Sequence, residues 1–133
     1  MAVNTADARL EARWRDILSV HARTMCEIDR ALHPHGLGAS DFEVLDLLAA
    51  GTREEGDQCR VQNLAGRVHL SQSALSRLIG RLEKDGLVVR SVCAEDRRGV
   101  YVTLTGKGRE LHAAVLPLQR AVLARLLGPT EQD

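Results

Sequence analysis

The sequence predicts a mainly α-helical chain with one small β-hairpin, folded as a single domain over residues 1–133. Three observations carry this prediction. Apolar residues recur at helical spacing through most of the chain, and residues typical of helix caps and helix breaks separate these runs. Two short β-branched runs lie late in the sequence, with a polar link between them. Hydrophobic residues make up 44% of the 133 residues, which suffices for one modest core.

The first predicted helix covers Asp7–Leu32, and the Pro and Gly residues of His33–Gly38 end it. A second helix is predicted over Asp41–Ala50. Ser40 is its expected N-cap, because Glu43 three residues later completes the pattern of a capping box. The apolar face of this helix is expected to comprise Phe42, Leu45, Leu48 and Ala49.

A third helix is predicted over Val61–Val68, followed by a tight turn at residues 69–70. Ser71 then caps a fourth helix that ends near Lys84, where Gly86 supplies a left-handed residue. The buried stripe of the fourth helix is expected to comprise Ala74, Leu75, Leu78, Ile79 and Leu82.

The two predicted strands are Leu87–Val92 and Val100–Leu104, and the polar residues 93–99 join them as a hairpin loop. Thr105 caps a long last helix that ends before Gly128–Pro129. Helix, tight turn, helix and hairpin in this order form a winged helix-turn-helix, with flanking helices at both ends.

Such an arrangement places its second helix in the major groove of duplex DNA. Arg77 is the predicted base-contacting residue, because an arginine can bind guanine with two hydrogen bonds. Ser71 and Gln72 lie at the helix N-terminus, where free backbone amides favour phosphate. The exposed face of this helix is expected to comprise Gln72, Ser73, Ser76, Arg77, Gly80 and Arg81.

The loop Asp96–Gly99 fits a wing that enters the minor groove. Arg98 would be drawn there by the negative potential of the groove, and Asp96 would hold its guanidinium in a fixed pose. Arg97 would instead meet the phosphate backbone. Charge supports a DNA contact in this part of the chain: the formal net charge is +0, but residues 60–98 carry 8 Lys or Arg against 4 Asp or Glu.

Other function classes find little support in the sequence. No apolar run is long enough to span a membrane and no export signal is visible, so we expect a cytoplasmic protein without a membrane partner. Cys26, Cys59 and Cys93 form no C-x-x-C pair, which favours reduced thiols. Neither a catalytic motif nor a phosphate-binding loop is recognisable. We therefore expect no enzyme activity, no cofactor and no metal site.

Several motifs occur together: S-Q-S-A-L-S-R-L at residues 71–78, L-E-K-D-G-L-V at 82–88, D-R-R-G at 96–99 and L-T-G-K-G at 104–108. With the start of the second helix at 37–48, this set resembles the multiple antibiotic resistance regulator (MarR) family over most of the chain. The resemblance implies a homodimeric transcriptional regulator, usually a repressor of a pseudo-palindromic operator, often released by a small ligand or by oxidation. The DNA contacts that it carries over are Ser71, Gln72, Ser73, Ser76, Arg77, and Arg98 with Asp96.

The resemblance assigns residues 38–105 to DNA binding and residues 6–33 and 106–133 to dimerisation. The family's final helix would begin near residue 130, where this sequence ends, so we expect either a longer chain or a reduced dimer interface. The family's ligand cleft makes Trp14 and His21 candidate ligand-binding residues. Packing in the core or in the dimer is the alternative for Trp14. Oxidant sensing by Cys26 and metal sensing by the scattered histidines are further alternatives.

A winged helix that binds only protein is the competing hypothesis for function. Its helices and hairpin would look the same, but the basic segment and the wing arginines would then have no purpose. An exposed apolar patch in place of a basic surface would favour it. An enzyme is a more distant third.

Overall fold

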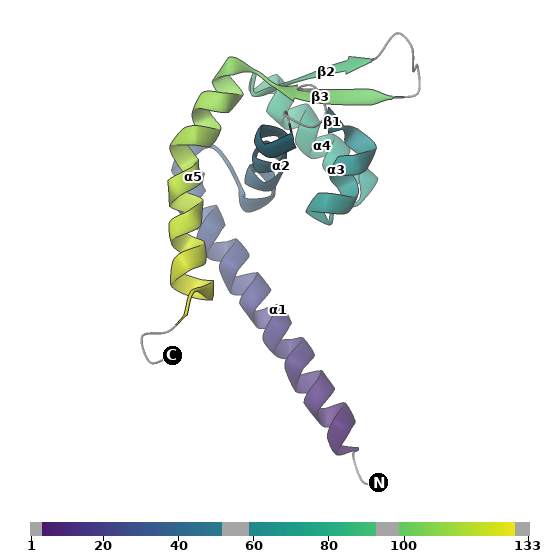
Figure 1. Cartoon of the computed structure of the whole chain (residues 1–133), viewed down its shortest axis with the longest axis vertical. Coiled ribbons are helices and arrows are strands. Elements are labelled where there is room, and N and C mark those ends of the chain that lie inside the picture. Colours follow the sequence, from purple (N-terminus) through teal and green to yellow (C-terminus); the bar gives the residue numbers. More distant parts are fainter. Residues whose placement is uncertain (1–3, 52–58, 93–98, 130–133) are drawn as a thin grey trace.

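Helices dominate the computed structural model, which describes residues 4–51, 59–92 and 99–129 (Figure 1). The mainly α-helical fold with a β-hairpin is confirmed. In chain order the elements of the described residues are α1 (Thr5–Leu32), the 3-10 helix η1 (His33–His35), α2 (Ala39–Gly51), β1 (Cys59–Arg60), α3 (Val61–Val68), α4 (Gln72–Lys84), β2 (Val88–Val92), β3 (Val100–Leu104) and α5 (Gly106–Leu127).

The helix α1 begins at Thr5, slightly earlier than predicted, because the side chain of Asn4 accepts a hydrogen bond from the amide of Ala6 at 3.0 Å. It ends at Leu32, as predicted. After η1, Gly36 adopts a left-handed conformation with a φ of 77°. Residues with a side chain rarely take this conformation, so the glycine allows the turn into α2.

The predicted capping box at the start of α2 is wrong. The helix begins at Ala39, and Ser40 lies inside its first turn. Two carboxylates bind the free amides instead: Asp41 accepts from the amide of Gly38, and Asp29 of α1 accepts from the amide of Ala39, each at 2.7 Å. Because these acids already satisfy the N-terminus, Ser40 is not needed as a cap.

The helix-turn-helix follows the prediction closely. The bounds of α3 are those expected, and His69 makes the turn in a left-handed conformation with a φ of 59°. The hydroxyl of Ser71 accepts from the amide of Ala74 at 3.1 Å and so caps α4. Gly86, with a φ of 78°, ends the helix as predicted.

The sheet has the strand order β1-β3-β2, and both pairings are antiparallel. The hairpin pairs Val88 with Leu104 and Val92 with Val100. The short strand β1 was not predicted from the sequence. Its two residues form a strand only because β3 pairs with them, so no pattern in the local sequence predicts this strand.

The hydrophobic core lies where α2 and α4 meet the sheet, the end of α1 and α5. Phe42 of α2 is completely buried, and four residues of the predicted stripe of α4 pack into the same core: Leu75, Leu78, Ile79 and Leu82. The fifth, Ala74, is half-buried and lies outside this core. The hairpin and α4 therefore pack against the same hydrophobic core. The most deeply buried large side chains include Leu32, Phe42, Leu45, Leu64, Leu75, Ile79, Leu82 and Val102.

The start of α5 packs tightly against the end of α4. Thr105 accepts from the amide of Gly108 at 3.0 Å, and its hydroxyl donates to the carbonyl of Gly86 at 2.6 Å. A Cβ atom at Gly108 would lie 2.1 Å from the carbonyl oxygen of Leu87. Only glycine therefore lets the two segments approach this closely.

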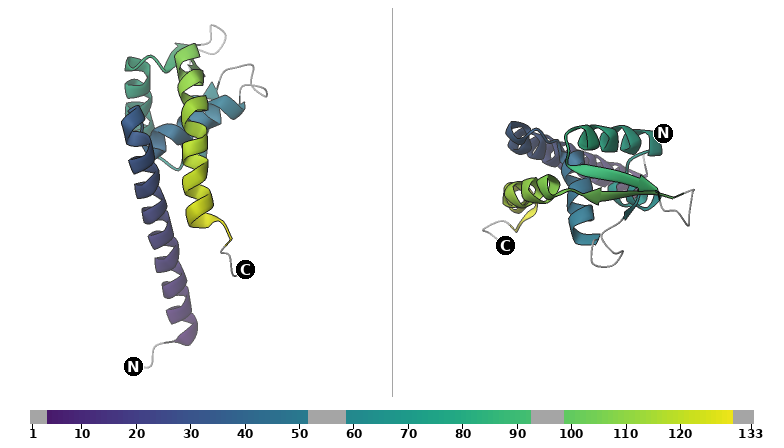
Figure 2. Two further views of the ribbon diagram at one scale, coloured as in Figure 1. Left: turned by 90° about the vertical axis from the view of Figure 1, so that its left-hand side faces the viewer. Right: turned by 90° about the horizontal axis from the view of Figure 1, so that it is seen from above.

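The first half of α1 projects away from the rest of the molecule, whereas its second half runs beside α5 (Figures 1 and 2). This projecting half and the helical turn that follows it carry large apolar side chains that remain exposed: Leu10, Trp14, Ile17, Leu18 and Val20. An apolar stripe of this kind is typical of a surface that a partner covers. No helix in the described residues has the length and apolar character needed to span a membrane.

Candidate nucleic-acid interface

The helix α4 presents a polar face to solvent. Leu75, Ile79 and Leu82 point into the core, and this fixes which residues point outward. Of the predicted contact residues, those exposed on α4 and at its cap are Ser71, Gln72, Ser73, Ser76, Arg77 and Arg81, whereas Gly80 is half-buried. The structure thus gathers the predicted helical residues on one accessible surface.

The hydroxyl group of Ser71 lies 3.3 Å from that of Ser73, in addition to its bond to the amide of Ala74. This cap holds the first turn of α4 rigid and keeps both serines at its N-terminal end. The positive end of the helix dipole lies at the same place, which favours a phosphate group there.

Arg77 and Arg81 differ in their environment, although both are exposed on the same helix. Among the described residues, the guanidinium of Arg77 has no hydrogen bond or ion pair. That of Arg81 donates to Asp41 of α2, whose side chain is only 6% exposed. A buried carboxylate needs such a partner, so the structure gives Arg81 a role in holding α4 against α2.

Arg90 of β2 is a residue that sequence reasoning missed. Its side-chain Nη2 donates to the carbonyl of Ser76 at 2.9 Å, and its backbone amide donates to Oε2 of Glu83 at 3.2 Å. Its Nε lies 3.8 Å from Oε1 of the same glutamate. In the sequence, Arg90 is one polar residue in a short strand, and nothing marks its contact with α4.

The predicted wing residues Asp96, Arg97 and Arg98 lie outside the described residues. Near the loop end of the hairpin, the guanidinium of Arg60 lies over the ring of Tyr101, with its central carbon 5.9 Å from the ring centroid. This contact joins β1 to β3 beside their backbone pairing. Arg60 therefore links the hairpin to β1, and Arg90 links it to α4.

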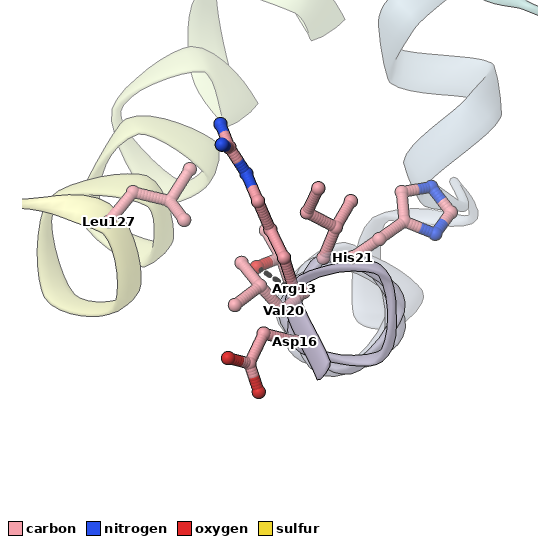
Figure 3. A pocket seen from close by; sticks show the side chains of 7 residues that line it. Arg13, Asp16, Val20, His21 and Leu127 are labelled. Atoms are coloured by element: carbon pink, nitrogen blue, oxygen red, sulfur yellow. Dashed lines mark hydrogen bonds between the residues drawn. The ribbon is translucent and has the colours of Figure 1, made fainter. Parts of the chain in front are cut away.

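The two candidate ligand-binding residues, Trp14 and His21, differ in their surroundings. His21 borders a cavity of about 430 Å³ beside α1, whereas Trp14 does not and is 58% exposed (Figure 3). Trp14 therefore does not pack in the core of the single chain, which rules out that alternative from the sequence analysis. The cavity is lined by Arg13, Asp16, Ile17, Val20, His21, Thr24 and Leu127.

His21 also borders a second cavity, of about 310 Å³, between α1, α2 and the turn before α4. Burial raises the pKa of Glu43 there, and the negative charge of Asp46 raises it further, while Arg120 lowers it. The remaining lining residues are Met25, Ser40, Arg67, Val68, His69 and Leu70. Within the described ranges, no group of three or more His, Cys, Asp or Glu side chains is placed to hold a metal ion.

Among known protein families, the model of the MarR family matches the chain over residues 39–100. A relative described as an uncharacterized HTH-type transcriptional regulator, YkoM of Bacillus subtilis, is 34% identical over 102 residues, which are 74% of this chain and 63% of that protein. The chain therefore spans less than two thirds of that relative. The transcriptional activatory protein BadR of Rhodopseudomonas palustris is 33% identical over 129 residues, which are 94% of this chain and 73% of BadR.

Solved structures give the same result. The chain is similar to AbsC, a MarR family transcriptional regulator from Streptomyces coelicolor, with a TM-score of 0.78 and 33% identity over 94% of this chain and 80% of AbsC. It is also similar to Sco3205, a MarR family regulator of the same organism solved in complex with DNA, with a TM-score of 0.82 and 27% identity. That match covers 99% of this chain and 81% of Sco3205.

Proposed function

The chain belongs to the MarR family of transcriptional regulators, and we propose on this basis that it is a homodimeric repressor of a pseudo-palindromic DNA operator. The observation that carries the proposal is the exposure of the Arg77 side chain on the outer face of α4. This side chain is without a partner among the described residues, and it lies on the same face as Gln72 and Ser73. An arginine presented in this way can reach a guanine in the major groove.

Residues 38–105 form the DNA-binding part of the proposed regulator, and residues 6–33 and 106–133 form its dimerisation part. The exposed apolar stripe on the projecting half of α1 supports this division, because a second copy would remove it from water. Two recognition helices in such a dimer would read half-sites about 10 base pairs apart, or a multiple of that distance.

We also propose that a small molecule binds in the second cavity and thereby causes the protein to release the operator. This cavity touches α1 on one side and residues 68–70, which lead into α4, on the other. A ligand there would contact both the dimerisation part and the turn that sets the direction of the recognition helix. Its volume of about 310 Å³ suits a small ligand.

The second candidate function is protein binding through the hairpin. Val89, Val92 and Val100 are exposed on β2 and β3, and exposed apolar residues favour a protein partner. The polar outer face of α4, with the exposed Arg77, favours DNA instead, and we give that surface precedence.

Selection from a random-sequence duplex library tests the proposal. Wild-type protein is expected to enrich a pseudo-palindromic motif, and the duplex so obtained, placed over a promoter, is expected to reduce reporter output. Increased output would contradict repression but leave operator binding intact. Failure to enrich any motif would contradict operator binding and favour the protein-binding alternative.

A further inference from the structure

Arg90 reaches from the hairpin across one flank of the recognition helix. Its Nη2 donates to the carbonyl of Ser76 near the start of α4, and its backbone amide donates to Glu83 near the end. One strand residue therefore contacts two points of α4 that lie two helical turns apart. In Figure 1 the strand β2 lies beside α4, as these bonds require.

The sequence of α4 leaves space for this arginine. Ser76, Gly80 and Glu83 share one face of the helix, because their spacing is that of successive helical turns. A Cβ atom at Gly80 would lie 3.5 Å from Nη2 of Arg90, which is ordinary van der Waals contact, so only a side chain longer than that of alanine would meet the guanidinium. A small residue at position 80 therefore keeps this flank of α4 open to Arg90.

The opposite attachment of α4 comes from Arg81, which binds Asp41 of α2. One arginine thus ties the recognition helix to the helical core, and another ties it to the hairpin. Arg77 lies between the attached residues and stays unengaged among the described residues. The rotation of α4 about its axis decides where Arg77 points. The buried stripe of α4 sets that rotation, and the two arginine attachments on its flanks hold it further.

We infer that Arg90 is a positioning residue that sets the orientation of α4 relative to the hairpin, and so sets base specificity without binding DNA itself. The effect on base specificity rests on the proposed function. The attachment of Arg90 to α4 is a property of the free protein and does not depend on that function. A guanidinium suits the role because Nη2 donates to Ser76 while Nε of the same planar group stays 3.8 Å from Oε1 of Glu83. A lysine at this position would keep the charge but lose the fork.

Fluorescence anisotropy with Arg90→Met and Arg90→Lys tests the consequence. The probes are a duplex enriched by the wild-type protein from a random library and a scrambled duplex of equal composition. We expect both variants to lose about tenfold in affinity for the enriched duplex, which is within the cost of one misplaced base contact. Affinity for the scrambled duplex and the salt dependence of binding should stay unchanged.

Val89→Ala is the matched control, because it truncates the exposed side chain of the residue that precedes Arg90 on β2. It should leave both affinities unchanged. Equal losses on both probes, with a salt slope lower by about one, would show that Arg90 binds a phosphate and would overturn the inference. Unchanged affinities for Arg90→Met would overturn it as well.

Hydrogen exchange in the free protein tests the attachment of α4 without any DNA, and so tests the inference independently of the proposed function. Peptides that cover α4 should exchange faster in Arg90→Met than in wild type, and Glu83→Gln should give a smaller increase. Equal exchange in wild type and Arg90→Met would overturn the inference even if the protein binds an operator. If no duplex is enriched, the proposed function fails, and faster exchange in Arg90→Met would still support the attachment of α4.

Discussion

Asp41 of α2 binds two partners that lie in different parts of the chain. One carboxylate oxygen accepts from Arg81 of the recognition helix, and the other accepts from the amide of Gly38 at 2.7 Å. The side chain is almost fully buried, so both bonds are needed to compensate the loss of its hydration. The same residue thereby starts α2 and anchors α4.

Asp41→Ala should lower the free energy of unfolding by about 1–3 kcal/mol, because it leaves the half-buried amide of Gly38 and the guanidinium of Arg81 without their acceptor. Urea denaturation measures the change. Ser40→Ala is the matched control and should change stability by less than about 0.5 kcal/mol, since Ser40 does not cap α2. A larger loss of stability for Ser40→Ala than for Asp41→Ala would contradict this assignment and support Ser40 as the N-cap of α2.

Gly108→Ala should destabilise the protein by about 3 kcal/mol, because its Cβ atom would collide with the carbonyl oxygen of Leu87. Gly106→Ala is the control, since a Cβ atom there meets nothing within 4 Å. It should be neutral or slightly stabilising. Thermal unfolding of both variants checks the prediction, and similar melting temperatures would contradict it.

Glu43→Gln should stabilise the protein at pH 7 and have little effect near pH 4. Burial and the charge of Asp46 raise the pKa of Glu43 above its usual 4.5, so the folded protein favours the protonated carboxyl. The stability gained from that proton is present below the unfolded-state pKa and is lost as the pH rises through the folded-state pKa. Melting temperatures of both proteins across this range test it; an equal difference at both pH values would be inconsistent with it.

Ile17→Glu should weaken the proposed dimer by about tenfold or more, because it places a charge in the centre of the exposed stripe on α1. Sedimentation over a range of protein concentrations measures the association. Val89→Glu makes the same kind of change at an exposed position on β2 and should leave association unchanged. A wild-type protein that stays monomeric at every concentration would contradict the dimer.

Local sequence predicts most of this fold. The bounds of α3 and β3 and the cap of α4 agree with prediction, because helix caps, turn residues and β-branched runs act over a few residues. The start of α2 was mispredicted because one of the acids that cap it, Asp29, comes from α1. The strand β1 was missed because only its pairing with β3 makes it a strand.

The candidate site was predictable as a surface but not in its internal contacts. Helical spacing placed Gln72, Ser73 and Arg77 on the outer face of α4. It could not distinguish Arg77 from Arg81, because the partner of Arg81 lies 40 residues away in the sequence. The contact of Arg90 with Ser76, across 14 residues, likewise depends on how the hairpin packs.

Fluorescence-anisotropy titration of wild type and Arg77→Ala, with the library-enriched duplex and its scrambled counterpart across salt concentrations, tests the central claim most directly. We predict that wild type strongly prefers the enriched duplex, and that its affinity falls steeply with salt. Arg77→Ala should lose about 1–3 kcal/mol of binding free energy on that duplex only. Equal and weak binding of wild type to both duplexes, or an Arg77→Ala protein that discriminates as well as wild type, would contradict the account.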